Sequence, residues 1–438
     1  MRRDLSIHLP GDVFTEILEI VRDPPTHGWA QQVLVLASVC RGWREVAVGT
    51  PTLWRYIVAP AYDIRFIALS LERSQQCPLV IEYHTKKPNH SVLYLLAKHS
   101  ERWEHLSLYI PPSSYPLLST IKGKVPLLKR LALQATTGDD PQPHQQLSGF
   151  EIAPALQYLD LQRFYPDLRQ DSSTPWVRLT YLCCQSIELS RLYSLLANTP
   201  TLSRLHVSDI SHDWPYKQSK NEILTQLKVL SIVNCDLRVI YSLLSRFSNL
   251  AELSILIFSD PGQANTGLPV ILPYLYRLKI QINGIFPGLV NFLVFEALNL
   301  SEMEFSGCHS LEDSDDEHED RIEENAATGR SHLQFLWNFI QSSRCSLTSL
   351  VLHFEVDFPT CEMAPLLKAL LSLEHLDISV VHMECVPFCA MLPATAVFPK
   401  LRRLYLHIPS EAHSIEVIND LIALATSNHI LKVWLVDR

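Results

Sequence analysis

The chain has 438 residues, of which 47% are hydrophobic, so it can bury a large core; intrinsic disorder and a small disulfide-stapled fold are both excluded. Its formal net charge of -9 argues against a general binder of nucleic acids or anionic membranes, because such proteins need a basic surface. Ten cysteines without an amino-terminal signal segment predict reduced thiols and a cytoplasmic or nuclear location. No apolar run reaches the roughly 18 residues that a membrane span needs, so no contact with a membrane is expected.

Residues 1–58 have a pattern of their own, which predicts a small helical module. The first helix begins after Leu9-Pro10, because proline is favoured in the first helical turn, and it ends at Asp23-Pro24-Pro25. A second amphipathic run ends at Thr50-Pro51, and its apolar stripe contains Val33, Leu36, Ala37, Cys40, Trp43 and Ala47. A segment of this length is too short to bury this much apolar surface by itself. We therefore expect it to pack on the following repeats, on a partner, or on both.

Residues 59–101 are expected to connect this module to the rest of the chain. Within them, Leu79–Tyr83 alternates as a half-buried strand does and is a candidate for the first unit of a repeat.

From residue 102 to 438 a short phrase, apolar-x-x-apolar-x-apolar, returns along the chain, as in Leu128-Leu131-Leu133. Thirteen copies begin at positions 103, 128, 156, 179, 202, 227, 250, 275, 300, 347, 373, 401 and 430. Apart from one longer interval after position 300, successive copies lie 23 to 29 residues apart. The pattern also accounts for the leucine content, 70 of 438 residues.

Each unit is predicted to contain a strand followed by a helix. The end of each phrase alternates as a strand does, and helical stretches such as Arg191–Ala197 and Arg238–Leu244 lie between phrases. Because one unit cannot bury its own apolar face, the units must stack into an α/β solenoid whose strands line a concave wall. A period near 25 residues, rather than seven, disfavours an all-helical protein or a coiled coil.

The phrase resembles the leucine-rich repeat, which continues to Asn or Cys; here only Cys235 and Cys308 stand at that place, so an irregular horseshoe is expected. In the first module, Leu9-Pro10, Ile17-Leu18, Val39–Trp43 and Leu53-Trp54 resemble the F-box in order and spacing. Together with the repeats behind it, the chain resembles the fungal-type F-box families. It departs from them at Asp12, where Glu is more usual, and in the long connection at residues 25–29.

The F-box resemblance implies binding to a Skp-type adaptor and a cullin in an SCF ubiquitin ligase, with the repeats capturing a protein substrate. The residues then expected to contact the adaptor are Leu9, Pro10, Val13, Ile17, Leu18, Cys40 and Trp43. An alternative for Trp43 is a place in the internal core of the module. A few apolar anchors of this kind carry most of the energy of such an interface.

On the repeats, side chains between the last two apolar positions of each phrase, and their outer neighbours, are predicted to face the concave wall. The candidates for substrate binding are Arg130, Tyr158, Tyr181, Arg204, Arg277, Lys279, Arg403, Tyr405 and Trp434. Tyr, Trp and Arg are the residues that dominate protein–protein hot spots, and no basic stripe predicts nucleic-acid binding.

The interval after position 300 contains an acidic insertion at about residues 309–331. Residues 309–330 hold nine acids against Arg321 and Arg330, a local charge of -7, so the rest of the chain is nearly neutral. Such a composition predicts a disordered loop, either a solvated tether or a site of phosphorylation at Ser310 and Ser314.

No catalytic or nucleotide-binding motif is present, so neither an enzyme nor a cofactor is expected. The spacing of His382, Cys385 and Cys389 is better explained by buried thiols than by a metal site, and no metal is predicted. The leading hypothesis is a non-catalytic substrate-recognition subunit of a ubiquitin ligase. The alternatives are a leucine-rich-repeat scaffold outside any ligase, and a sensor of a small molecule bound on the concave wall.

Overall fold

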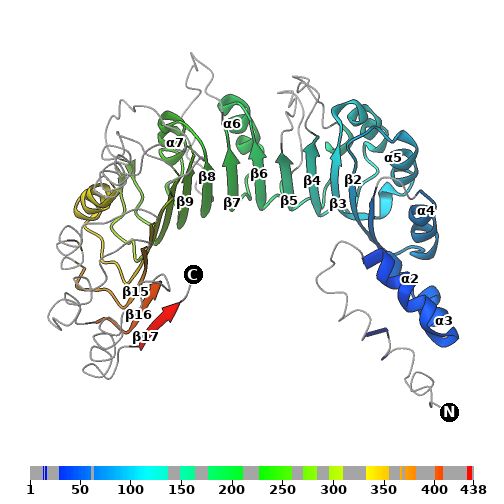
Figure 1. Ribbon diagram of the computed structural model, residues 1–438. Coiled ribbons are helices and arrows are strands. Elements are labelled where there is room, and N and C mark those ends of the chain that lie inside the picture. The colour runs from blue at the N-terminus through cyan, green and yellow to red at the C-terminus, as the bar shows by residue number, and fades with distance from the viewer. Residues whose placement is uncertain are drawn as a thin grey trace, which may run out of the picture. The chain divides into compact units, whose positions relative to one another are not determined.

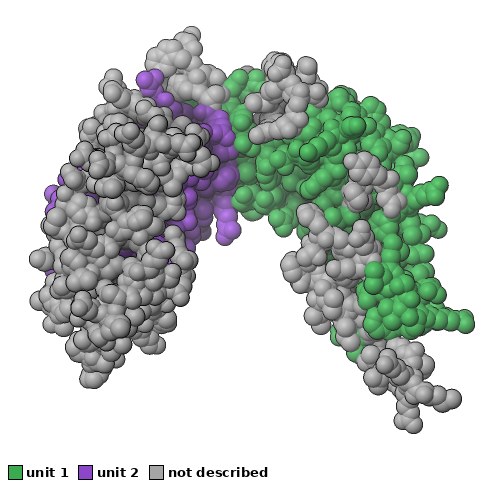
Figure 2. All heavy atoms as spheres, in the orientation of Figure 1, with its two compact units in different colours: residues 1–202 green, residues 203–438 purple. Residues whose placement is uncertain are grey.

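The computed structural model describes residues 13, 15–16, 29–60, 64–136, 148–162, 176–210, 226–258, 270–283, 295–308, 332–354, 366, 370–380, 400–407 and 432–436. They belong to two compact units, residues 1–202 and 203–438 (Figure 2). Several predicted features lie outside the described residues: Leu9, Pro10, Ile17, Leu18, the acidic insertion at 309–331, and the His382–Cys389 segment.

The first unit begins with a pair of helices, α2 (Trp29–Val39) and α3 (Arg41–Gly49), followed by a 3-10 turn, η2 (Pro51–Trp54). Cys40 separates the helices because its backbone is extended, and its Sγ accepts a hydrogen bond from the Trp43 amide, as an N-cap does. The Trp54 indole donates to the Ala47 carbonyl at 2.6 Å, which joins η2 to the end of α3.

In the described part of this unit, six parallel strands follow in chain order: β1 (Tyr56–Pro60), β2 (Leu79–His84), β3 (Trp103–Ile110), β4 (Arg130–Ala135), β5 (Tyr158–Gln162) and β6 (Tyr181–Gln185). The connections contain α4 (Ile64–Arg73), α5 (His90–Ala97) and α6 (Leu189–Ala197), and three 3-10 turns, η3 (Ser100–Arg102), η4 (Pro112–Ile121) and η5 (Ser148–Phe150). Figure 1 shows α4 and α5 on one side of these strands. The apolar side chains that alternate along the strands are buried on that side.

Within the residues that the structure describes, the second unit repeats this arrangement with nine parallel strands. In order they are β7 (Arg204–Ser208), β8 (Val229–Val233), β9 (Glu252–Ile257), β11 (Arg277–Asn283), β13 (Glu302–Cys308), β14 (Ser349–Phe354), β15 (His375–Val380), β16 (Arg403–His407) and β17 (Lys432–Val436). The helices of this unit include α7 (Leu237–Leu244) and the segment 332–343. A separate small sheet is formed by β10 (Val270–Ile271) and β12 (Phe295–Glu296).

The predicted α/β class and the repeat period are confirmed. Each of the thirteen phrases carries one strand of the parallel sheets, and the stretches predicted as helices lie within α6 and α7. The strand predicted at Leu79–Tyr83 is β2. Among the described strands, β1, β10 and β12 were not predicted: β1 begins at Tyr56, before the expected end of the amino-terminal module, and none of the three carries the leucine phrase.

Six cysteines whose side chains the structure describes form no disulfide: Cys40, Cys77, Cys183, Cys184, Cys235 and Cys345. Cys184 and Cys235 are buried, and burial raises the pKa of Cys235 to about 12, so its thiolate is scarce at neutral pH. These two positions are therefore apolar core sites. Within the described residues, none of the helices has the length and apolar character that crossing a membrane requires.

Gly149 in η5 lies against the backbone of η4, so a side chain there has no room. A Cβ added at Gly149 would overlap the Leu118 carbonyl and stand 3.1 Å from a side-chain carbon of Ile121. We expect Gly149→Ala to lower the free energy of unfolding by about 2 to 3 kcal/mol, as overpacking against a rigid neighbour does. Urea unfolding of the full chain measures this.

Gly42 in α3 provides the matched control for Gly149, because a Cβ there meets only the Cys40 Sγ at 4.0 Å. Gly42→Ala should be neutral or stabilising, since alanine is favoured in a helix by about 1 kcal/mol. Equal effects of the two substitutions would contradict the close packing of η4 on η5.

Candidate binding surface

On the face opposite the core, the side chains of the sheets form ordered rows. The rows arise because equivalent residues of neighbouring strands pair with no change of register from β3 to β6 and from β7 to β17, in the pairs described. Counting from the first residue of each phrase, we call the positions two, four and six residues later the first, second and third rows. Arg130, Ala132 and Gln134 of β4 exemplify the three rows. One residue per strand contributes to each row.

In the first unit, an arginine and two tyrosines of the first row stack on one another. The Arg130 guanidinium lies 4.5 Å from the centre of the Tyr158 ring, and the Tyr158 and Tyr181 rings are parallel at 4.2 Å. Burial is the main cause that raises the pKa of both phenols, so both rings are neutral at physiological pH. The predicted residues Arg130, Tyr158 and Tyr181 thus form one stack, in which the two phenol rings are in contact and the guanidinium lies over the Tyr158 ring.

In the second unit, two of the predicted cations, Arg277 and Lys279, are paired with acids on neighbouring strands. Arg277 lies between two glutamates: its Nε donates to Glu302 Oε2 at 2.7 Å, and its Nη1 is 3.9 Å from Glu252 Oε2. Lys279 forms an ion pair with Glu304 in the second row. Exposed pairs of this kind contribute about 0 to 1 kcal/mol each, so a binding partner can exchange them at little cost.

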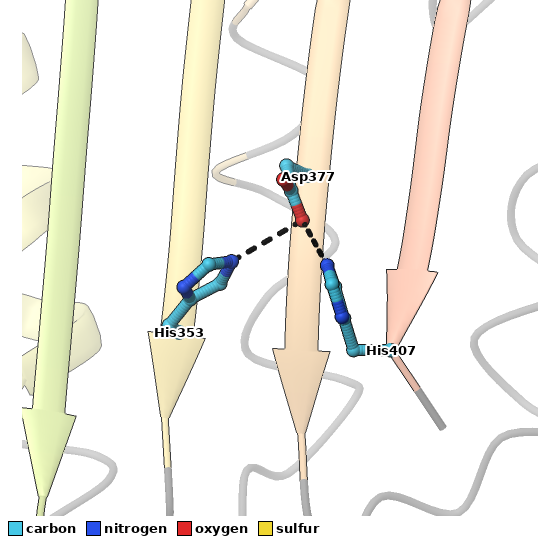
Figure 3. Close-up of side chains that lie close together, drawn as sticks. All are labelled: His353, Asp377 and His407. Carbon is cyan, nitrogen blue, oxygen red and sulfur yellow. Dashed lines mark hydrogen bonds and ion pairs between the residues drawn. The ribbon is translucent and has the colours of Figure 1, made fainter. Parts of the chain in front are cut away.

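A third cluster lies on β14, β15 and β16 and contains two histidines and an aspartate. The Nε2 atoms of His353 and His407 lie 3.2 and 3.0 Å from the same oxygen, Oδ1 of Asp377. Figure 3 shows the two imidazoles on the strands flanking β15, each directed at the carboxylate. Burial acts to raise the pKa of Asp377, but the hydrogen bond from His353 and the neighbouring imidazoles outweigh it and lower the pKa.

The candidates in the last strands have different surroundings. The His375 and Tyr405 rings, in the first and second rows, lie with centres 5.2 Å apart. Arg204 and Arg403 are exposed first-row residues. Trp434 lies in the second row of β17, but its side chain is outside the described residues.

The helix pair supplies a second surface, which is apolar. Three exposed residues of α2, here called the α2 patch, lie on the side away from the core: Leu34, Val35 and Val39. Of the predicted adaptor contacts, Val13 is exposed, Cys40 is half-buried, and Trp43 packs partly on the cluster of Val33, Leu53 and Trp54. Trp43 therefore contributes to the internal core of the module, and its contact with an adaptor stays a prediction.

The repeat phrase did not indicate His353 and His407. Both belong to the third row, beyond the last apolar residue of the phrase, whereas Asp377 belongs to the second row. The signal is visible once the thirteen units are aligned. The sixth position after the start of each phrase then shows the two histidines in units on either side of the one that contains the aspartate.

No protein-family model matches the sequence, and no curated protein matches it either. Among solved structures, the chain is similar to a leucine-rich-repeat protein of Leptospira interrogans, at 12% sequence identity and a TM-score of 0.28. The match covers 86% of this chain and 100% of that protein.

Proposed function

We propose that this protein is the substrate-recognition subunit of an SCF-type ubiquitin ligase, with an F-box module that binds a Skp-type adaptor and leucine-rich-repeat-like units that bind a protein substrate. The observation that carries the proposal is the α2 patch. Val35 and Val39 are 62% and 56% exposed on a short helical module whose order of apolar residues resembles the F-box. Neighbouring exposed apolar side chains that form one patch are typical of a protein interaction site, whereas single ones are common on any surface.

The polar face of the sheets supports the second half of the proposal. Aromatic and arginine side chains gather in the first row, and Arg130, Tyr158 and Tyr181 form a preassembled stack. Such groups are frequent at interface hot spots, because they bury a large area at a small entropic cost. Both charge signs occur on the face, as with Arg277 and Glu302, which suits a protein substrate better than a polyanion.

The adaptor contact can be tested by titrating purified full-length protein with a Skp-type adaptor in a calorimeter. Val35→Glu combined with Val39→Glu should weaken binding by at least about tenfold, because charges are placed in an apolar interface centre. Leu9→Ala combined with Pro10→Ala tests the sequence prediction directly and should also weaken binding, by about 2 kcal/mol.

Val177→Glu is the matched control, since Val177 is 53% exposed in the same unit but lies before β6. It should bind the adaptor as the wild type does. A wild-type chain that does not bind the adaptor, or a double Val35/Val39 variant that binds it normally, would reject the proposal. The first result would favour the scaffold outside any ligase.

A further inference from the structure

The cluster of His353, Asp377 and His407 brings together side chains that are far apart in sequence. His353 and Asp377 are 24 residues apart, and the three come from three consecutive strands of the second unit. All three potential ligand atoms lie within 4.8 Å of one another. The sheet register holds the backbones, so the convergence is a property of the fold rather than of one loop.

The distances suit a small cation. Zn²⁺ binds imidazole nitrogen and carboxylate oxygen at about 2.0 to 2.2 Å, which places two ligand atoms of a tetrahedral site roughly 3.3 Å apart. The two nitrogen-to-oxygen distances here, 3.2 and 3.0 Å, are close to that value. The ligand nitrogens of the two imidazoles themselves lie within 4.8 Å of each other.

We infer that His353, Asp377 and His407 form a binding site for a divalent transition-metal ion, with Zn²⁺ as the preferred occupant. The donor set, two imidazoles and one carboxylate, is one that Zn²⁺ accepts, whereas Ca²⁺ and Mg²⁺ prefer all-oxygen ligands. The aspartate supplies one negative charge, and each neutral imidazole binds through Nε2 while its proton resides on Nδ1.

The site is open on the side away from the core. The side chains of His353, Asp377 and His407 are 29%, 19% and 18% exposed, so an ion can enter without unfolding the sheet. Three protein ligands leave the fourth tetrahedral position to water. The site lies on the same face as Tyr405 and His375, so the ion would add a fixed positive charge to the polar face of the second unit.

The test uses the folded full-length chain after chelator treatment and alkylation of its accessible thiols, so that exposed cysteines cannot bind the ion. Calorimetric titration with Zn²⁺ should show a site that is weakened by about 100-fold or more in the His353→Ala/His407→Ala variant. Titration with Co²⁺ should give the visible bands of a four-coordinate ion with nitrogen and oxygen ligands. These bands should be lost in the same variant.

His105→Gln is the matched control, because His105 is a half-buried histidine in the polar face of the first unit. It should bind Zn²⁺ and Co²⁺ as the wild type does. Asp377→Asn is a milder second variant that keeps the shape of the side chain and should weaken binding. The inference is wrong if alkylated wild type binds neither ion, or if folded His353/His407 and Asp377 variants bind both ions normally.

Discussion

Phe305→Ala is expected to lower the free energy of unfolding of the second unit by about 3 to 5 kcal/mol, the usual cost of deleting a buried ring. Phe305 is fully buried on β13, which is paired on both sides, so the strand cannot move to fill the cavity. Its ring stacks on Phe335 at 5.6 Å and meets His332 edge-on at 5.8 Å. The residue thus joins the sheet to the 332–343 helix.

Equilibrium unfolding in urea, followed by tryptophan fluorescence and circular dichroism, measures this loss. Ser306→Ala is the control, because Ser306 is the next residue on β13 and faces the opposite, polar side. It should change stability by less than about 0.5 kcal/mol, as surface substitutions do. A loss below about 1 kcal/mol for Phe305→Ala would contradict the packing of the helix on β13.

Acid should destabilise the second unit through His332. Burial lowers the pKa of His332 to about 4 from its usual 6.5, and the side chain is only 2% exposed. Between about pH 4 and 6.5, His332 is therefore protonated in the unfolded state but not in the folded state. Stability is greatest above about pH 6.5 and falls as the pH drops toward 4, by about 3 kcal/mol from this residue alone.

His332→Leu isolates this contribution, because carboxylates elsewhere titrate in the same range in both proteins. The difference in unfolding free energy between neutral pH and about pH 4 should be smaller in the variant by about 3 kcal/mol. Urea unfolding at several pH values provides the comparison. Parallel pH profiles for the wild type and the variant would mean that His332 is accessible to protons in the folded state.

The strands could be predicted from the sequence because their signal is local and periodic. Leu131 and Leu133, like their equivalents in other units, alternate with residues that are only partly buried or exposed, and each phrase must bury its apolar pair against the next unit. The same argument identified Arg130, Tyr158 and Tyr181 as neighbours on one face. Their stacking distance of 4.2 Å follows from the spacing of adjacent parallel strands.

Features that depend on contacts between distant segments could not be predicted in this way. The third row lies beyond the apolar phrase, so nothing local marks His353 and His407 as neighbours of Asp377; the pairing of β14, β15 and β16 is needed. The expectation that the chain holds no metal site was drawn from the spacing of residues within one segment, whereas the site that we infer takes its three side chains from three repeats. Similarly, β1 is defined by its pairing with β2 rather than by leucines.

Because inward and outward residues alternate along each strand, the residues that stabilise the core are different from those that form the outer face. In β11, Leu278 and Ile280 hold the sheet together, while Arg277, Lys279 and Gln281 are only partly buried and face outward. Neighbouring residues in a row come from different repeats. A substitution at one outward position therefore alters contacts with the two flanking strands but leaves the volume of the core unchanged. The chemistry of this face can therefore change in small steps, and a combinatorial library confined to the three rows would sample new surfaces on a constant scaffold.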